Sequence, residues 1–147
     1  MGGSSVMDSV LLDTNVLLDF FVAGRAEHRI VDALLRRLVE RDVRLCVVAS
    51  SLERVYYVIA MSDGRQIGRQ VVDAVLTSMD VLPVDAECCR LALACSELLF
   101  DDALVRVAAE VAGVSFIVTR DKRSFIGSTV PSISPGHLLH EIESTYE

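Results

Sequence analysis

The chain has 147 residues, of which 52% are hydrophobic, and its formal net charge is −7. This composition suits one domain with a full hydrophobic core, and the acidic balance argues against a protein that coats nucleic acid through a basic surface. It is compatible with an enzyme that reaches nucleic acid through a metal ion. No apolar stretch approaches the roughly 18 residues of a membrane span, and no secretory signal opens the chain. We therefore expect a single cytoplasmic domain over residues 1–147, away from membranes, with residues 1–8 disordered or derived from cloning.

Strand-like and helix-like stretches alternate along the chain. Short, continuous apolar runs, typical of buried parallel strands, occupy 10–12, 45–49, 81–84 and 115–119, with an edge strand added over 131–133. Apolar residues at helical spacing predict helices over 14–22, 27–40, 50–60, 68–79, 85–99, 101–112 and 137–144. The alternation predicts an α/β fold with a central parallel sheet of four to five strands flanked by helices.

Asp13 directly follows the first apolar run. A carboxylate at the end of a buried strand is costly unless it is paired or binds a metal ion. In open α/β sheets, ligands and catalytic groups collect outside the carboxyl ends of the strands. We interpret Asp13 as a functional residue, with Asn15 placed to orient it or to contact a phosphate. The alternative is that Asp13 only caps the next helix, a role for which Thr14 and Asn15 are also available.

Three further acidic residues follow a strand or open a helix. Glu53 also fits a capping box with Ser50, in which each side chain bonds a backbone amide at the start of the helix. In the pair Asp101 and Asp102, we assign the first as the helix cap and the second as a ligand. Asp121 follows the fourth strand, where a plain polar turn is the alternative.

The four acids acquire a chemical meaning when they are considered together. Hard divalent cations prefer oxygen ligands, and three or four converging carboxylates suit Mg²⁺ or Mn²⁺. One or two such ions can activate water and stabilise an in-line displacement at phosphorus. Our hypothesis is that Asp13, Glu53, Asp102 and Asp121 meet in one pocket and hold a divalent metal.

At this point the sequence resembles a PIN domain, and within that family the single-domain, VapC-type toxin ribonucleases. The opening Asp-x-Asn and the closing Thr-Arg-Asp-x-x-x-Phe are the most specific parts of the resemblance. The stretches that carry it span nearly the whole chain: VLLDTNVLLDF (10–20), SSLERVYYVI (50–59), DVLPVDAE (80–87), FDDALVRVAAEVAGVSFIVTRDKRSF (100–125) and ISPGHLL (133–139). The resemblance implies a three-layer fold with a metal-dependent nuclease site at one end of the sheet.

The resemblance also implies hydrolysis of an RNA phosphodiester bond by water that Mg²⁺ or Mn²⁺ activates. Asp13, Glu53 and Asp102 match the first three acids of the family site, and Asp121 stands at its fourth, more variable position. The polar positions that support the site are matched by Asn15 and Thr119. Proteins of this type often form homodimers, and the toxins pair with a small antitoxin protein that blocks the site.

The basic residues beside Asp121 are candidates for binding substrate. Arg120, Lys122 and Arg123 flank it directly, and we infer from this proximity that they contact RNA phosphates. Substrate specificity is expected to reside in two loops, over 62–70 and 126–136.

Other functions compete with this interpretation. A phosphatase of the haloacid dehalogenase type also begins with a strand that ends in Asp, but it needs a second Asp where this chain has Asn15. Activity on a small phosphomonoester but not on RNA would favour it. A non-catalytic PIN-like binding or scaffold module would be favoured by an absence of metal binding. If the protein is a nuclease, it is either the toxin of a toxin–antitoxin pair or a housekeeping RNA-processing enzyme.

Overall fold

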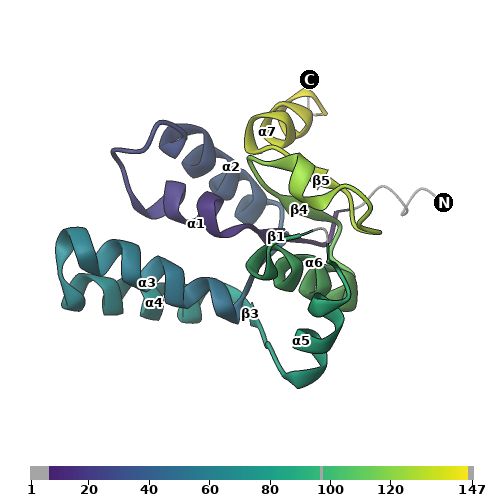
Figure 1. The fold of residues 1–147 in the computed structure, drawn as a ribbon. Coiled ribbons are helices and arrows are strands. Elements are labelled where there is room, and N and C mark those ends of the chain that lie inside the picture. The colour runs from purple at the N-terminus through teal and green to yellow at the C-terminus, as the bar shows by residue number, and fades with distance from the viewer. Residues whose placement is uncertain (1–6, 97, 146–147) are drawn as a thin grey trace.

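The computed structural model describes residues 7–96 and 98–145. Its centre is a parallel sheet with the strand order β3-β2-β1-β4-β5 (Figure 1). The strands are β1 (Ser9–Leu12), β2 (Arg44–Val48), β3 (Asp80–Leu82), β4 (Phe116–Val118) and β5 (Ser132–Ile133). β1 lies in the middle of the sheet and is buried along its whole length. The predicted parallel sheet is therefore confirmed.

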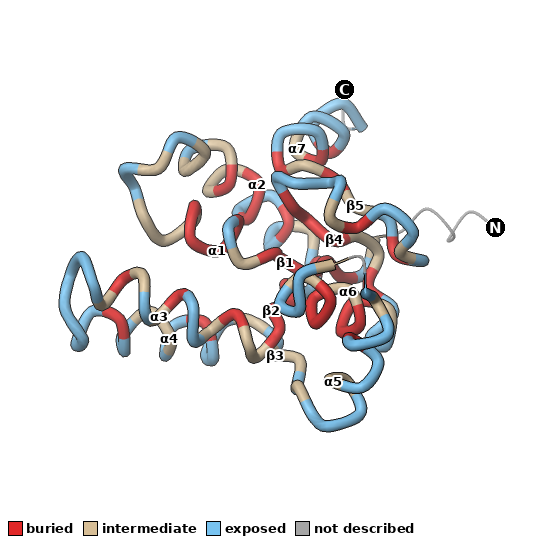
Figure 2. The backbone as a smooth tube through the Cα atoms, in the orientation of Figure 1, coloured by how far each residue is buried: buried red, intermediate tan, exposed pale blue. Residues whose placement is uncertain are grey.

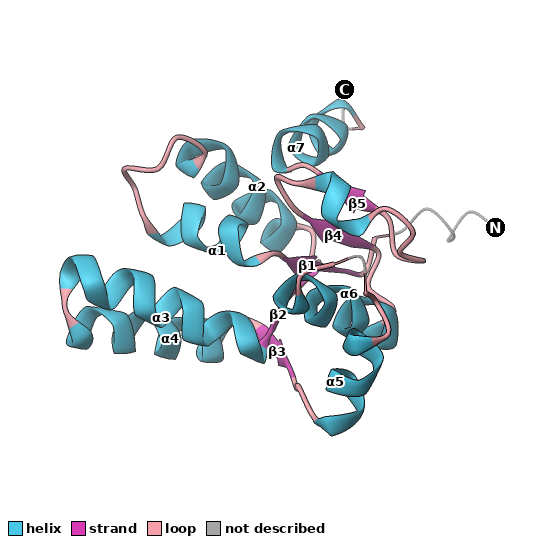
Figure 3. Ribbon diagram, in the orientation of Figure 1, coloured by secondary structure: helices cyan, strands magenta, loops and turns pink. Residues whose placement is uncertain are grey.

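Helices cover both faces of the sheet (Figure 3). They are α1 (Thr14–Phe21), α2 (His28–Glu40), α3 (Ala49–Asp63), α4 (Arg65–Ser78), α5 (Ala86–Leu93), α6 (Phe100–Ala112), α7 (Pro135–Ser144) and the short 3₁₀ helix η2 (Lys122–Phe125). Within the described residues, none of these helices is long and apolar enough to cross a membrane.

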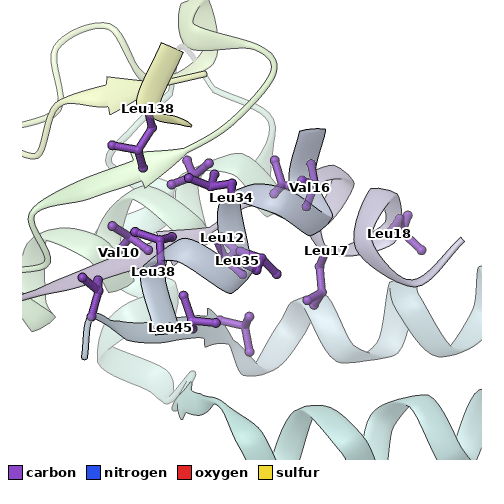
Figure 4. Packing of buried hydrophobic residues seen from close by; sticks show 14 of the residues in the cluster. Val10, Leu12, Val16, Leu17, Leu18, Leu34, Leu35, Leu38, Leu45 and Leu138 are labelled. Carbon is purple, nitrogen blue, oxygen red and sulfur yellow. The ribbon is translucent and has the colours of Figure 1, made fainter. Parts of the chain in front are cut away.

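The two faces of β1 lie in different hydrophobic layers, because successive side chains of a strand point to opposite faces. Val10 and Leu12 pack in the larger layer with residues of α1, α2 and α7 (Figure 4). Leu11, between them, packs in a second layer with residues of α6. Burial is accordingly concentrated along the sheet and on the helix faces turned toward it (Figure 2). This arrangement explains why the strands read as continuous apolar runs, and it confirms the expected three layers.

Helices α3 and α4 form a hairpin that extends away from the sheet (Figure 1). Gly64 alone separates them, at a φ of 98° that few residues other than glycine adopt. At Gly68, an added Cβ would lie 3.0 Å from the Tyr56 ring, so the hairpin packs closely there. The loop expected over 62–70 is therefore wrong: one glycine reverses the chain, and helix resumes immediately after it.

The helix expected over 85–99 is also shorter than predicted. Asp85 caps α5 by accepting from the amide of Cys88 at 2.9 Å, but the helix ends at Leu93. Tighter backbone bonds then close the turn, including one from the amide of Cys95 to the carbonyl of Ala92. Apolar residues continue at helical spacing beyond this point, which is why periodicity alone overran the end.

The ends of the β1 and β4 segments are held by defined contacts. Met7 packs against the larger hydrophobic layer, and the Asp8 carbonyl accepts from the Arg44 amide at 2.9 Å. Disorder was expected over residues 1–8, but residues 7 and 8 are held by these contacts. Residues 1–6 lie outside the described residues. After β4, the loop before β5 is tied to α6, because Glu110 accepts from the Thr129 amide at 2.9 Å.

Candidate active site

A cavity of about 810 Å³ opens beside the carboxyl end of β1, between α1, α3 and α6. Three of the four predicted acids line it: Asp13, Glu53 and Asp102. Asn15 lines it as well, as an exposed side chain. The carboxyl end of a central strand is where open α/β sheets bind their ligands. The topology thus brings together acids that are far apart in the sequence.

Asp13 both caps a helix and faces the cavity. Its Oδ1 accepts from the Thr14 amide at 2.8 Å, so Asp13 itself is the N-cap of α1, not Thr14 or Asn15. Its Oδ2 accepts from Thr119 Oγ1 at 2.8 Å. Burial raises the pKa of Asp13 even though both hydrogen bonds favour the ionised form. Oδ1 therefore caps the helix, as the alternative interpretation expected. Oδ2 does not take part in the cap and instead accepts from the buried Thr119 hydroxyl.

Glu53 does not take part in a capping box. Helix α3 begins at Ala49, so Ser50 and Glu53 both lie inside it, and the residue before the helix makes no side-chain cap bond. Ser51, the next residue, is buried, and its Oγ lies 2.7 Å from Thr14 Oγ1. This hydrogen bond joins α3 to α1 in the wall of the cavity, and Glu53, which lines the same cavity, is exposed. Its carboxylate is therefore available to the cavity.

Asp101 and Asp102 lie in the first turn of α6, where the helix dipole favours negative charge. Asp101 is not the N-cap, because Leu99 occupies that position, although Asp101 Oδ1 accepts from the Asp102 amide at 2.9 Å. Burial raises the pKa of Asp102 to about 6, helped by the negative charges of Asp101, Asp13 and Asp121. The carboxylates that follow β1, open α6 and follow β4 are therefore close enough for each charge to affect the pKa of its neighbours.

The raised pKa of Asp102, caused first by burial, predicts that this residue makes the protein more stable at lower pH. The pKa of Asp102 is higher in the folded protein than its ordinary value of 3.8, so the folded state binds this proton more tightly. The stabilisation is complete below the unfolded value and is lost as the pH rises through about 6. We expect the Tm of the metal-free protein to rise more in wild type than in Asp102→Asn when the pH is lowered from about 7.5 to about 5.

Thermal unfolding followed by circular dichroism across this pH range measures the difference. Asp63→Asn, at the exposed far end of α3, is the matched control and should keep the wild-type dependence. Equal pH dependence in Asp102→Asn and wild type would mean that Asp102 does not hold its proton as described.

Asp121 lies beside the cavity and is not one of its lining residues. It caps η2, accepting from the Arg123 amide at 3.2 Å and from Ser124 Oγ at 2.9 Å. The polar-turn alternative therefore describes its hydrogen bonds. Its charge nevertheless helps to raise the pKa of both Asp13 and Asp102.

Thr119, predicted to support the site, is completely buried between Asp13 and Asp121. Its hydroxyl donates to Asp13 Oδ2 and accepts from the Asp121 amide at 3.0 Å. One hydroxyl therefore fixes both an acid of the cavity and the turn that carries the neighbouring acid.

The donor set fits a hard divalent cation. The pKa values of Asp13 and Asp102 are raised first by burial and then by the charges of neighbouring acids, and a bound cation would offset both effects. Over residues 7–96 and 98–145, no three side chains among His, Cys, Asp and Glu are arranged to hold one ion. Mg²⁺ usually keeps several waters and uses one or two protein carboxylates, so it does not require three carboxylates in direct contact with the ion.

The sequence analysis missed a buried charge cluster next to the cavity. Asp19 of α1 is 1% exposed, and its Oδ1 accepts from Arg25 Nε at 2.8 Å. Arg120 Nε lies 2.8 Å from Asp19 Oδ2, so this predicted phosphate contact is already engaged in an ion pair. Arg25 lines the cavity, whereas Lys122 and Arg123 are exposed on η2. The available signal was the position of Asp19, three residues after buried Val16 on the apolar face of a helix.

Comparison with known proteins matches the chain to one family model and to a group of solved structures. The model for the PIN domain matches residues 10–126, and no curated protein matches significantly. VapC20 of Mycobacterium tuberculosis, a toxin that cleaves the sarcin-ricin loop, has a TM-score of 0.67 at 17% identity, covering 82% of this chain and 96% of its own.

Two toxin–antitoxin structures are similar to a comparable degree. DNA-bound VapBC from Salmonella typhimurium has a TM-score of 0.67 at 18% identity and covers 88% of this chain and 99% of its own. A toxin–antitoxin complex from Klebsiella pneumoniae has a TM-score of 0.65 at 19% identity and covers 86% and 97%. At these identities the likeness concerns the fold.

Proposed function

The chain belongs to the PIN domain family, and we propose that it is a metal-dependent endoribonuclease that hydrolyses RNA phosphodiester bonds. The observation that carries the proposal is the cavity at the end of β1, which Asp13, Glu53 and Asp102 all line. The raised pKa values of Asp13 and Asp102 support a site that is completed by a cation. The solved structures with the same fold support the assignment to a nuclease of the toxin type.

We assign Asp13, Glu53 and Asp102 as the residues that hold Mg²⁺ or Mn²⁺, with Asp121 assisting directly or through water. When bound, the metal supplies an activated water and neutralises charge that develops at phosphorus. The residues of the chain prepare the site for it. Thr119 and the Thr14 amide fix both oxygens of Asp13, so that this carboxylate does not have to reorient when a cation arrives.

The polar residues around the acids are assigned to the substrate. Asn15, exposed at the cavity, is placed to donate to a phosphate oxygen or to orient Asp13. Lys122 and Arg123 are exposed on η2, on the side of Asp121, where they can contact RNA phosphates. Arg120 contributes its positive charge there while its Nε remains near Asp19.

We further propose that the protein is the toxin of a toxin–antitoxin pair and that it acts as a homodimer. The similarity to VapC20 and to two toxin–antitoxin complexes supports this role over housekeeping RNA processing. The expected partner is a small antitoxin protein that blocks the cavity. Co-expression with the product of a neighbouring small gene, followed by loss of RNA cleavage in the purified complex, tests the assignment.

The direct test of the proposed function is a calorimetric titration with Mn²⁺ together with an RNA cleavage assay. Wild type should bind Mn²⁺ and cleave RNA, and Asp13→Ala should lose both, because it removes a carboxylate whose oxygens face a cation site. Asp63→Ala, at the far end of the α3–α4 hairpin, removes an exposed carboxylate and should bind and cleave as wild type does.

Three results contradict the proposal in different ways. Absence of both Mn²⁺ binding and RNA cleavage in wild type would favour a binding or scaffold module. Hydrolysis of a small phosphomonoester without RNA cleavage would favour a phosphatase. Cleavage that survives unchanged in Asp13→Ala would place the active site elsewhere.

A further inference from the structure

The cluster around Asp19 contains more positive charge than is needed to neutralise this buried carboxylate. One guanidinium is enough to neutralise one buried carboxylate. Asp19 has two: Arg25, from the segment between α1 and α2, and Arg120, which follows β4. The cluster therefore carries one excess positive charge, at the side of a cavity whose other charged residues are mostly acidic.

The two arginines are held differently. Arg25 donates a directed hydrogen bond from Nε to Asp19 Oδ1. Arg120 approaches Oδ2 as an ion pair without hydrogen-bond alignment. Both side chains stay partly exposed, at 30% for Arg25 and 40% for Arg120. Of the two, Arg25 lines the cavity. The cavity therefore contains a positively charged side chain whose orientation is fixed by Asp19.

An arginine fixed through Nε keeps its terminal nitrogens for a second partner. Guanidinium groups match phosphate oxygens in a planar, two-point geometry, and fixing the side chain beforehand reduces the entropy lost on binding. Arg54 also lines the cavity, but as an exposed side chain of α3. Arg25 is thus the cation of the cavity that a buried partner has oriented in advance.

We propose that Arg25, oriented by Asp19, binds a backbone phosphate of the RNA adjacent to the bond that is hydrolysed. This assignment rests on the proposed function and adds a substrate-binding residue to it, with Asp19 as the positioning residue. The cavity would then contact the substrate in two ways, at the carboxylates through a cation and at Arg25 directly. A purely structural role would instead confine Asp19 and Arg25 to joining α1 and α2, where His28 Nδ1 also lies 2.9 Å from the Asp19 carbonyl.

The dependence of RNA affinity on salt separates these roles. Each phosphate contact made by a cation releases counterions, so its loss lowers the slope of log affinity against log salt by about 0.7 for single-stranded RNA. The probe is a labelled single-stranded RNA pool of mixed sequence, because phosphate contacts are independent of sequence. Fluorescence anisotropy is measured with Mg²⁺ in an Asp13→Asn background, which prevents cleavage during the titration.

Arg25→Gln should weaken binding several-fold at low salt and reduce the slope by about 0.7. Arg25→Lys, which keeps the charge, should restore most of the slope. Arg36→Gln is the matched control, since Arg36 is an exposed arginine paired with Asp32 on α2, and it should keep the slope of the background. Thermal unfolding of each variant records any loss of stability separately.

The outcomes distinguish this inference from the proposed function. An unchanged slope and affinity in Arg25→Gln, with or without a lower Tm, overturns the role of Arg25 even if wild type cleaves RNA. A reduced slope together with no cleavage by wild type overturns the nuclease function and leaves Arg25 as an RNA contact. RNA bound by none of the proteins overturns both.

Discussion

Asp13→Asn should reduce RNA cleavage on the order of 10³-fold without unfolding the protein, because metal-ion charge stabilisation is worth several kcal/mol and each 1.36 kcal/mol is a factor of ten. The amide keeps the shape of the side chain but removes the anionic ligand. Burial already disfavours the charge of Asp13, as its raised pKa indicates, so its removal should leave the Tm unchanged or slightly higher. Activity and stability therefore move independently.

The measurement pairs initial rates of RNA cleavage with thermal unfolding of the same preparations. Asp101→Asn is the control, since it changes an exposed acid of the same cavity that is not assigned as a main ligand, and its rate should fall far less. Wild-type turnover by Asp13→Asn, with contaminating nuclease excluded, would refute the assignment of Asp13. A low rate accompanied by a collapsed Tm would show that Asp13 matters for folding instead.

The largest expected effect on stability comes from Leu34→Ala, which should lower the free energy of unfolding by about 2–5 kcal/mol. Leu34 is completely buried in the layer between α2 and the sheet (Figure 4). Truncation leaves a cavity that its packed neighbours fill only in part. Since domains are stable by about 5–15 kcal/mol, the variant should still fold.

Urea unfolding of the metal-free protein measures this difference without interference from ligand binding. Leu93→Ala makes the same chemical change at a leucine that is 71% exposed, and it should alter the free energy of unfolding by less than about 0.5 kcal/mol. Equal effects of the two substitutions would mean that Leu34 is not packed as described.

The sheet and the place of Asp13 were predictable because both depend on local patterns. A short apolar run that ends in a carboxylate indicates a buried strand with a charge at its end. As predicted, β1 places Asp13 at the carboxyl end of the sheet, where the cavity opens. Asp102 was predictable for a similar reason, since an acid in the first turn of a helix is favoured by the helix dipole. That both residues share one cavity follows from the parallel topology.

Other features depended on contacts that no local pattern contains. Asp19 is stabilised by Arg120, which lies far from it in the sequence and reaches it only through the pairing of β1 with β4. Helix α3 begins before Ser50, because its first turn is held by packing and by the Ser51–Thr14 hydrogen bond, so a plausible capping box was never formed. Tertiary contacts outweighed local signals at both positions.

The pairing of β1 with β4 also bears on when a newly made chain can acquire activity. Asp13 is synthesised well before Thr119, which donates to its Oδ2 and follows it by 106 positions. Until β4 and Thr119 have left the ribosome, the central strand lacks one neighbour and Asp13 Oδ2 lacks the hydroxyl that donates to it. A nascent chain therefore carries the acid at the end of β1 for more than a hundred residues of synthesis before the contacts that hold this carboxylate can form.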